Sequence, residues 1–333
     1  MSFRYINPGY AFLLDEGNTA TQYDSSAPDY DPTFANEAGL CLTPDDEDGA
    51  IIHLNGYTPG DELWISFEVL CGRRTDLYIT PPNYPGTKVI RIHTQQDDVE
   101  DDGKGYLFSI TLGETVSLPN WRGDDLPYNL HTNEQNNTKM QVWIHTKYGT
   151  NHIGFIHLYI NGEFVCQQGL NAVESSASVD YVTFKLAKVL GEASSTPISN
   201  IIISDEEISL LERVAALPMT NISTDMTDGG NGIYIANIPN QTLLQTSDTT
   251  ALSSIHDGLT VVTGIRQVAY PAYRTGELLN HLTAISKYDT LTTERGTMAL
   301  STDRTEVGSN TYSLPNMTLN DLSNYQFGWK AVE

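Results

Sequence analysis

The chain has 333 residues, of which 39% are hydrophobic and 18% are charged, and it contains 26 glycines and 15 prolines. This length leaves room for about two domains with cores of their own, and the composition is typical of a turn-rich β protein, not of a helical or disordered one. The formal net charge of −24, from 42 acidic and 18 basic residues, excludes general binding to nucleic acid or to an anionic membrane.

The sequence carries no sign of export. Its first residues lack both the basic and the apolar region of a signal peptide, and nowhere do about 20 apolar residues follow one another. The three cysteines, Cys41, Cys71 and Cys166, are widely spaced and odd in number, which argues against a disulfide framework or a zinc knuckle. We expect buried, reduced thiols, synthesis in a cytoplasm and no insertion into a membrane.

Short strands separated by turns are predicted over the first 200 or so residues. Residues 62–70 follow a Pro-Gly turn and are rich in β-branched and aromatic side chains, which fit a half-buried sheet. Similar runs cover residues 77–80, 88–93, 106–112, 140–147, 154–160, 164–167, 181–186 and 201–204. Many short strands at nearly regular spacing predict a β sandwich or jelly roll. The segments 81–86 and 119–137 are expected in loops.

A helix is predicted over residues 204–214. Ser204 precedes Glu207 by three residues, the spacing of a capping box, and acidic residues occupy the expected first turn. The apolar stripe would consist of Ile208, Leu211 and Val214. We interpret this segment as a structural helix that packs on the sandwich.

The remainder of the chain predicts a second, smaller unit. Residues 220–232 are rich in Asn, Asp, Thr and Gly and indicate a domain edge. Strand character returns at residues 232–236 and 259–265, and residues 276–285 predict a helix with Leu278, Leu282 and Ile285 on one face.

These elements divide the chain into three parts. We expect residues 1–15 to form an N-terminal docking segment, residues 16–218 a jelly-roll domain, and residues 219–333 a β-rich C-terminal domain with a short helix. The C-terminal domain is the alternative docking end. The expected fold class is therefore mostly β.

The most informative stretch is a strand that contains Trp143, followed by a polar loop and a strand that ends at Asn161-Gly162. Asn-Gly supplies the positive φ angles of a two-residue hairpin, so antiparallel strands are predicted here. The stretch resembles the central strands of concanavalin A-like and laminin G-like jelly rolls. The residues that carry the resemblance are Trp143, His145, Leu158, Tyr159, Asn161, Gly162 and Val165.

This resemblance covers roughly residues 8–215 and implies a sandwich that functions in carbohydrate or protein adhesion, although many such domains are structural spacers. Glycosidases of this superfamily carry closely spaced carboxylates on one strand face, and neither E-x-D-x-x-E nor E-x-D-x-E occurs here. Glu62 and Glu68 share a strand face but lie six residues apart, about 20 Å. We therefore expect no enzymatic activity.

Two sets of loop residues are candidate binding sites. Asp98, Glu100 and Asp102 precede Gly103 as the first ligands of a calcium loop would, but Ser109 stands where a bidentate Glu is expected. A solvated acidic loop is the favoured interpretation, calcium the alternative, and no other cofactor is expected. The aromatic candidates for ligand binding are Tyr84, Trp121, Tyr128 and Tyr148. Rings of this kind serve sugar recognition and protein interfaces alike.

His145 and His157 are expected on adjacent strands as a packed or solvent-facing pair and not as metal ligands. No nucleophile elbow, P-loop or dinucleotide fingerprint occurs in the sequence.

Four short stretches resemble bacteriophage and prophage virion proteins: residues 5–15, 201–207, 264–274 and 327–330. The resemblance implies a non-enzymatic virion protein of a phage tail or tail fibre, assembled in the bacterial cytoplasm. Its expected partners are further copies of itself, other virion proteins and host-surface glycans. The alternative is a free carbohydrate-binding lectin or a glycoside hydrolase of the concanavalin A-like superfamily.

Overall fold

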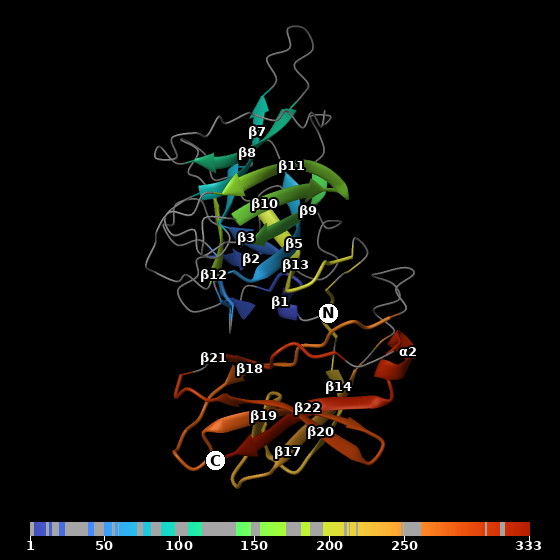
Figure 1. The fold of residues 1–333 in the computed structure, drawn as a ribbon. Coiled ribbons are helices and arrows are strands. Elements are labelled where there is room, and N and C mark those ends of the chain that lie inside the picture. Colours follow the sequence, from blue (N-terminus) through green and yellow to red (C-terminus); the bar gives the residue numbers. More distant parts are fainter. Residues whose placement is uncertain are drawn as a thin grey trace. The chain divides into compact units, whose positions relative to one another are not determined.

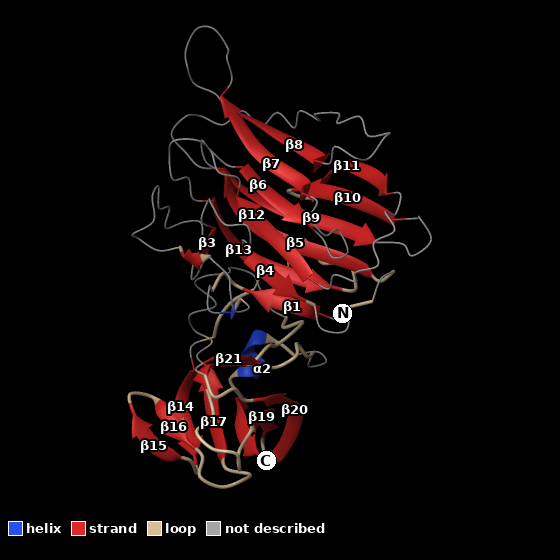
Figure 2. Cartoon of the chain, turned by 90° about the vertical axis from the view of Figure 1, so that its left-hand side faces the viewer, coloured by secondary structure: helices blue, strands red, loops and turns tan. Residues whose placement is uncertain are grey.

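A computed structural model defines the fold, and the chain divides into two units (Figure 1). The sandwich unit contains Arg4–Val214, and the C-terminal unit contains Ala215–Glu333 together with Met1–Phe3. The residues that the structure describes are 3–10, 13–14, 20–23, 39–42, 50–54, 57–58, 60–71, 76–80, 88–96, 106–114, 138–147, 154–170, 181–186, 196–209, 212, 214–217, 219–247, 249, 261–303, 305–313 and 317–333. In the described residues of both units, the regular secondary structure is almost entirely β-strand (Figure 2).

Two sheets form the sandwich unit. The large sheet has the order β11 (Glu163–Leu170), β10 (Gly154–Ile160), β9 (Thr138–Lys147), β5 (Glu62–Cys71), β13 (Thr196–Ser204), β3 (Leu40–Leu42) and β2 (Thr21–Gln22), and β1 (Phe3–Asn7) also pairs with β13. The small sheet has the order β4 (Ala50–His53), β12 (Tyr181–Leu186), β6 (Asp76–Thr80), β7 (Lys88–Gln96) and β8 (Tyr106–Glu114). Each of the nine strands predicted over residues 62–204 is confirmed, and the fold is a mostly β sandwich.

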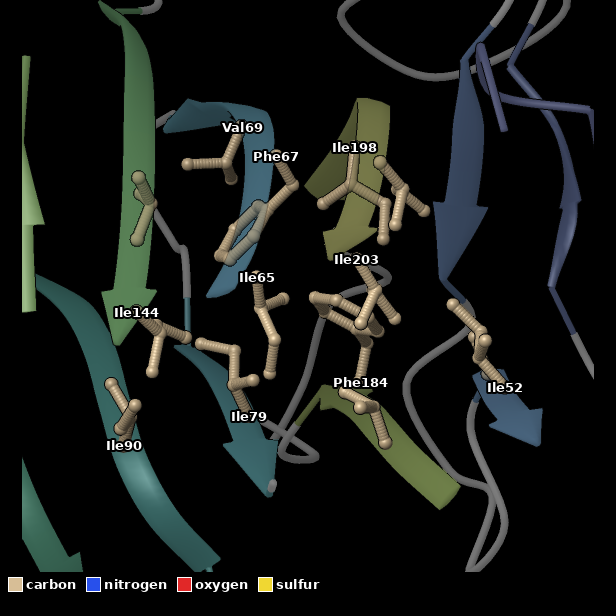
Figure 3. Packing of buried hydrophobic residues seen from close by; sticks show 14 of the residues in the cluster. Ile52, Ile65, Phe67, Val69, Ile79, Ile90, Ile144, Phe184, Ile198 and Ile203 are labelled. Carbon is tan, nitrogen blue, oxygen red and sulfur yellow. The ribbon is translucent and has the colours of Figure 1, made fainter. Parts of the chain in front are cut away.

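One apolar core lies between the two sheets. Alternate residues of β5, among them Ile65 and Phe67, are fully buried, and they meet Ile79 and Phe184 of the small sheet (Figure 3). The rings of Phe67 and Phe184 pack edge to face with centroids 5.1 Å apart, a favoured aromatic geometry. Because side chains alternate across a strand, the residues between these core positions turn to the opposite face of the large sheet.

The hairpin from β10 to β11 turns at Asn161 and Gly162, as predicted. Their φ angles are 49° and 86°, both in the left-handed region that an Asn-Gly turn supplies at low cost. Asn161 also fastens the turn to the neighbouring strand, because its Oδ1 accepts a hydrogen bond from the backbone N–H of Gln141 at 2.9 Å.

We expect Gly162→Ala to lower the free energy of unfolding by about 1–2 kcal/mol, because a Cβ makes the left-handed conformation unfavourable. Gly276→Ala is the matched control, since its φ is outside that region and a Cβ would meet nothing within 4 Å. Urea denaturation of both variants measures the difference. Equal stabilities would contradict the requirement for glycine at this position.

The helix predicted over residues 204–214 is absent from the described part of this segment. Ser204 is the last residue of β13 and pairs with Trp64, and its Oγ accepts a hydrogen bond from the N–H of Glu206. Further on, the N–H of Val214 donates to Oδ1 of Asn200, another β13 residue. Strand pairing at Ser204 and these bonds to β13 thus override the local helix signal.

A five-stranded antiparallel sheet is the centre of the C-terminal unit. Its order is β14 (Met219–Thr224), β17 (Thr242–Ser247), β22 (Tyr325–Val332), β19 (His281–Tyr288) and β20 (Leu291–Ala299). Two further strand pairs are β15 (Thr227–Gly230) with β16 (Ile233–Ile235), and β18 (Val268–Ala272) with β21 (Thr305–Gly308). Core residues of the unit include Ala284, Phe327 and Trp329.

Two sequence predictions for this unit are wrong. The helix over residues 276–285 is instead a bend followed by β19, which pairs along its whole length with both β20 and β22. Leu278, assigned to the apolar face of that helix, is 59% exposed. The strand over residues 259–265 is reduced, in its described residues, to isolated bridges at Val261 and Ile265. The short helix of this unit is α2 (Leu319–Leu322), capped by Thr318 and Asp321.

Candidate functional site

Aromatic and histidine side chains gather on the face of the large sheet that points away from the core. The ladder places Trp64 of β5 opposite His145 of β9, and His145 opposite His157 of β10. In the next row, Tyr159 of β10 lies opposite Phe164 of β11. We call six residues of this face the outer-face ring cluster: Trp64, His145, Phe155, His157, Tyr159 and Phe164.

The rings of this cluster touch one another across four strands. Trp64 stacks on His145 with centroids 4.1 Å apart and planes 7° apart. His145 then meets the edge of Phe155, whose ring stacks on His157 at 4.6 Å. At the β11 end of the cluster, the ring of Phe164 packs edge to face with that of Tyr159, with centroids 5.5 Å apart. The cluster is therefore continuous from β5 to β11.

Exposure differs between members of the outer-face ring cluster. Phe164 is 54% exposed, whereas Trp64, Phe155, His157 and Tyr159 are half-buried. Contiguous exposed apolar surface is typical of interaction sites, whereas a single exposed apolar side chain is not. The cluster thus has partly exposed aromatic surface, and Phe164 is its most accessible ring.

Charged groups flank the rings at one end of the face. Lys147 Nζ lies 3.1 Å from Oε1 of Glu62, the residue opposite it in the ladder, and His145 Nε2 lies 3.4 Å from Oε2. The hydrogen bond from Lys147 holds the pKa of Glu62 below its usual value. Burial lowers the pKa of His145, and His157 adds to this, whereas Glu62 and Glu207 oppose it. The net effect favours the neutral form of His145.

We expect His145 to make the fold less stable as the pH falls. Its folded pKa is depressed, so below the unfolded value of about 6.5 the unfolded chain binds more protons at this position. Stability present above that pH is then lost on acidification. His145→Gln should accordingly lose less free energy of unfolding than the wild type between about pH 7 and pH 5. Denaturation curves at both pH values measure the two losses, and equal losses would contradict the effect.

A second carboxylate, Glu68, lies further along β5 on the same face. Glu68 is buried, and its Oε2 accepts from Asn200 Nδ2 at 2.8 Å and meets Lys139 Nζ at 2.7 Å. Six residues of strand separate Glu68 from Glu62, about 20 Å, whereas a retaining glycosidase needs carboxylates about 5 Å apart. These two acids consequently do not form such a catalytic pair.

The binding residues predicted from the sequence lie outside the described residues. This applies to the aromatic candidates Tyr84, Trp121, Tyr128 and Tyr148 and to the calcium candidates Asp98, Glu100 and Asp102. Within the described ranges, no group of three or more His, Cys, Asp or Glu side chains could hold a metal ion. Nor is any helix in that part of the chain long and apolar enough to cross a membrane.

Sequence reasoning placed His145 and His157 on adjacent strands, which the structure confirms, but it did not identify the outer-face ring cluster. The signal was present in the period-2 pattern of β10, where Phe155, His157 and Tyr159 alternate with buried residues. This pattern does not reveal the strand order, which brings Trp64 and Phe164 to the same face.

No family model matches this sequence, and no curated protein matches it. Among solved structures, similarity is found to a mutant of alginate lyase Aly36B in complex with alginate trisaccharide, at 16% identity and a TM-score of 0.38, covering 62% of this chain and 99% of that one. Similarity is also found to an endo-beta-1,4-glucuronan lyase from the fungus Trichoderma reesei, at 11% identity and a TM-score of 0.35. The match covers 61% of this chain and 95% of that one.

A third similar structure is the CBM2 module of the evolved Dit of Lactobacillus casei BL23 phage J-1, at 14% identity and a TM-score of 0.34, covering 62% of this chain and 98% of that one. Similarities at these TM-scores assign this chain neither a family nor an activity. The function must therefore be argued from its own residues.

Proposed function

We propose that this chain is a non-enzymatic adhesion protein that binds carbohydrate through the outer-face ring cluster. The observation that carries the proposal is the continuous row of rings across β5, β9, β10 and β11, with Phe164 54% exposed at its edge. The C–H faces of a sugar ring stack on aromatic faces, which removes apolar surface from water.

Polar groups beside the rings supply the other half of sugar recognition. The carboxylate of Glu62 can accept hydrogen bonds from sugar hydroxyls, and Lys147 can donate to them. Both side chains are partly exposed and are held in place by their own ion pair. A few fixed polar groups beside apolar surface give a binding face its orientation and specificity.

A glycan array probed with the full chain tests this function. We expect retention on one class of glycan, and no release of reducing ends when that glycan is incubated with the protein. Release of reducing ends would favour the glycoside hydrolase and overturn the non-enzymatic part of the proposal. Absence of binding to every glycan would overturn the carbohydrate part.

We place this adhesion function in a phage-type particle, in which the chain contacts copies of itself and other virion proteins. The support is the resemblance of its short sequence stretches to virion proteins, together with apolar side chains that the C-terminal unit exposes. These exposed side chains include Ile222 on β14, Ile233 and Ile235 on β16, and Ile238. Exposed apolar surface of this kind is typical of interaction sites.

Sedimentation equilibrium of the full chain tests the subunit contacts. We expect a closed homo-oligomer that dissociates when Ile233 and Ile235 are both changed to Ser, since both are more than 40% exposed and lie on β16. A monomer at every concentration of the wild-type protein would contradict self-association.

A further inference from the structure

The charges around the outer-face ring cluster indicate which class of glycan it takes. The basic side chains among the described residues of β5, β9, β10 and β11, histidines aside, are Lys139 and Lys147. Lys147 Nζ is 3.1 Å from Glu62, and Lys139 Nζ is 2.7 Å from the buried Glu68. Each lysine is therefore neutralised by a carboxylate of the neighbouring strand.

Among the described residues, a further charged group near the rings is an acid. Glu207, which follows β13, is exposed and close enough to His145 to act on that side chain electrostatically. His145 itself is shielded, with 16% of its side chain exposed. On a larger scale, 31 of the 42 acidic residues precede residue 215, in the part of the chain that contains the sandwich unit.

An anionic glycan would meet an unfavourable environment on such a face. A uronate or sulfate group needs a cation that is not already paired, or a set of donors arranged around it. Here it would compete with Glu62 for Lys147 and with Glu68 for Lys139, inside the field of a strongly acidic unit. An uncharged sugar is not repelled by this field and can still stack on the aromatic rings.

We propose that the outer-face ring cluster selects neutral glycans and discriminates against uronate-containing and sulfated ones. This inference rests on the proposed function and adds the substrate class to it. The discrimination arises because Lys147 and Lys139 are already paired with Glu62 and Glu68, and ring stacking supplies the affinity.

Binding of the full chain to a matched panel tests the proposal. The probes are neutral glucan, galactan and mannan on one side and polygalacturonate and heparin on the other, measured by calorimetry in about 50 mM and about 500 mM NaCl. We expect at least one neutral glycan to bind at least about tenfold more tightly than either anionic one, with a Kd that salt changes by less than about twofold.

The outcomes of this panel distinguish a failure of the neutral preference from a failure of carbohydrate binding itself. Tighter binding to polygalacturonate or heparin, weakened strongly by salt, would overturn the neutral preference and leave carbohydrate binding intact. No binding to either class would instead remove the proposed function.

A charge variant tests the cause of the preference. Glu62→Gln removes the carboxylate that neutralises Lys147, so binding to polygalacturonate in low salt should rise at least about threefold and fall again as salt is added. Circular dichroism and a melting curve verify that the variant folds. A folded variant without this gain would contradict the role of the paired carboxylate.

Discussion

Phe67→Ala is expected to destabilise the protein by about 3–5 kcal/mol, the largest single effect on folding that we predict. Phe67 is fully buried in the middle of the sandwich core, and its ring packs edge to face on Phe184. Its removal loses the transfer free energy of the ring and leaves a cavity that two hydrogen-bonded sheets cannot close. Chemical denaturation measures the loss.

Leu291→Ala serves as the control for this core substitution. Leu291 is 69% exposed, so its truncation should change the free energy of unfolding by no more than about 0.5 kcal/mol. A loss for Phe67→Ala as small as that of Leu291→Ala would mean that the two sheets do not pack face to face through this residue.

Phe164→Ala is expected to weaken glycan binding by about tenfold, equivalent to about 1.4 kcal/mol, with little change in stability. Phe164 is the most exposed ring of the outer-face ring cluster and lies on β11, at the edge of the large sheet. A sugar stacked on it would lose apolar contact area, whereas the fold would lose, within the described residues, the partial contacts of Phe164 with Tyr159 and His157.

Titration calorimetry with the glycan identified on the array compares this variant with the wild type. The same Leu291→Ala protein is a suitable control, because it truncates an exposed apolar side chain on β20, in the C-terminal unit. Unchanged affinity for Phe164→Ala would place the sugar elsewhere on the protein. A loss of affinity in Leu291→Ala would indicate a nonspecific apolar effect.

The sandwich could be predicted from the sequence because each of its main strands has a recognisable local sequence pattern. β5, β9 and β10 combine β-branched and aromatic residues with period-2 alternation, and Asn161-Gly162 marks the hairpin. The two helix predictions were wrong because they also relied on local signals. Their helix signals were overridden by strand pairing, and the partners Trp64 of Ser204 and β22 of β19 lie far away in the sequence.

The candidate site was less accessible to sequence reasoning than the fold. Trp64 and His145 are 81 positions apart in the sequence, and only the β5–β9 register brings their rings together. Periodicity gives the face on which a side chain lies, but it does not give the order of strands within a sheet. The charge pairing of Lys147 with Glu62 depends on the same register.

A crystal structure of the full chain with its bound glycan tests the central claim most directly. We expect a sugar ring stacked on Phe164 or Trp64, with hydroxyls in hydrogen-bond contact with Glu62 or Lys147 on the outer face of β5, β9, β10 and β11. A glycan bound only at Tyr84, Trp121, Tyr128 and Tyr148, or only on the C-terminal unit, would contradict it.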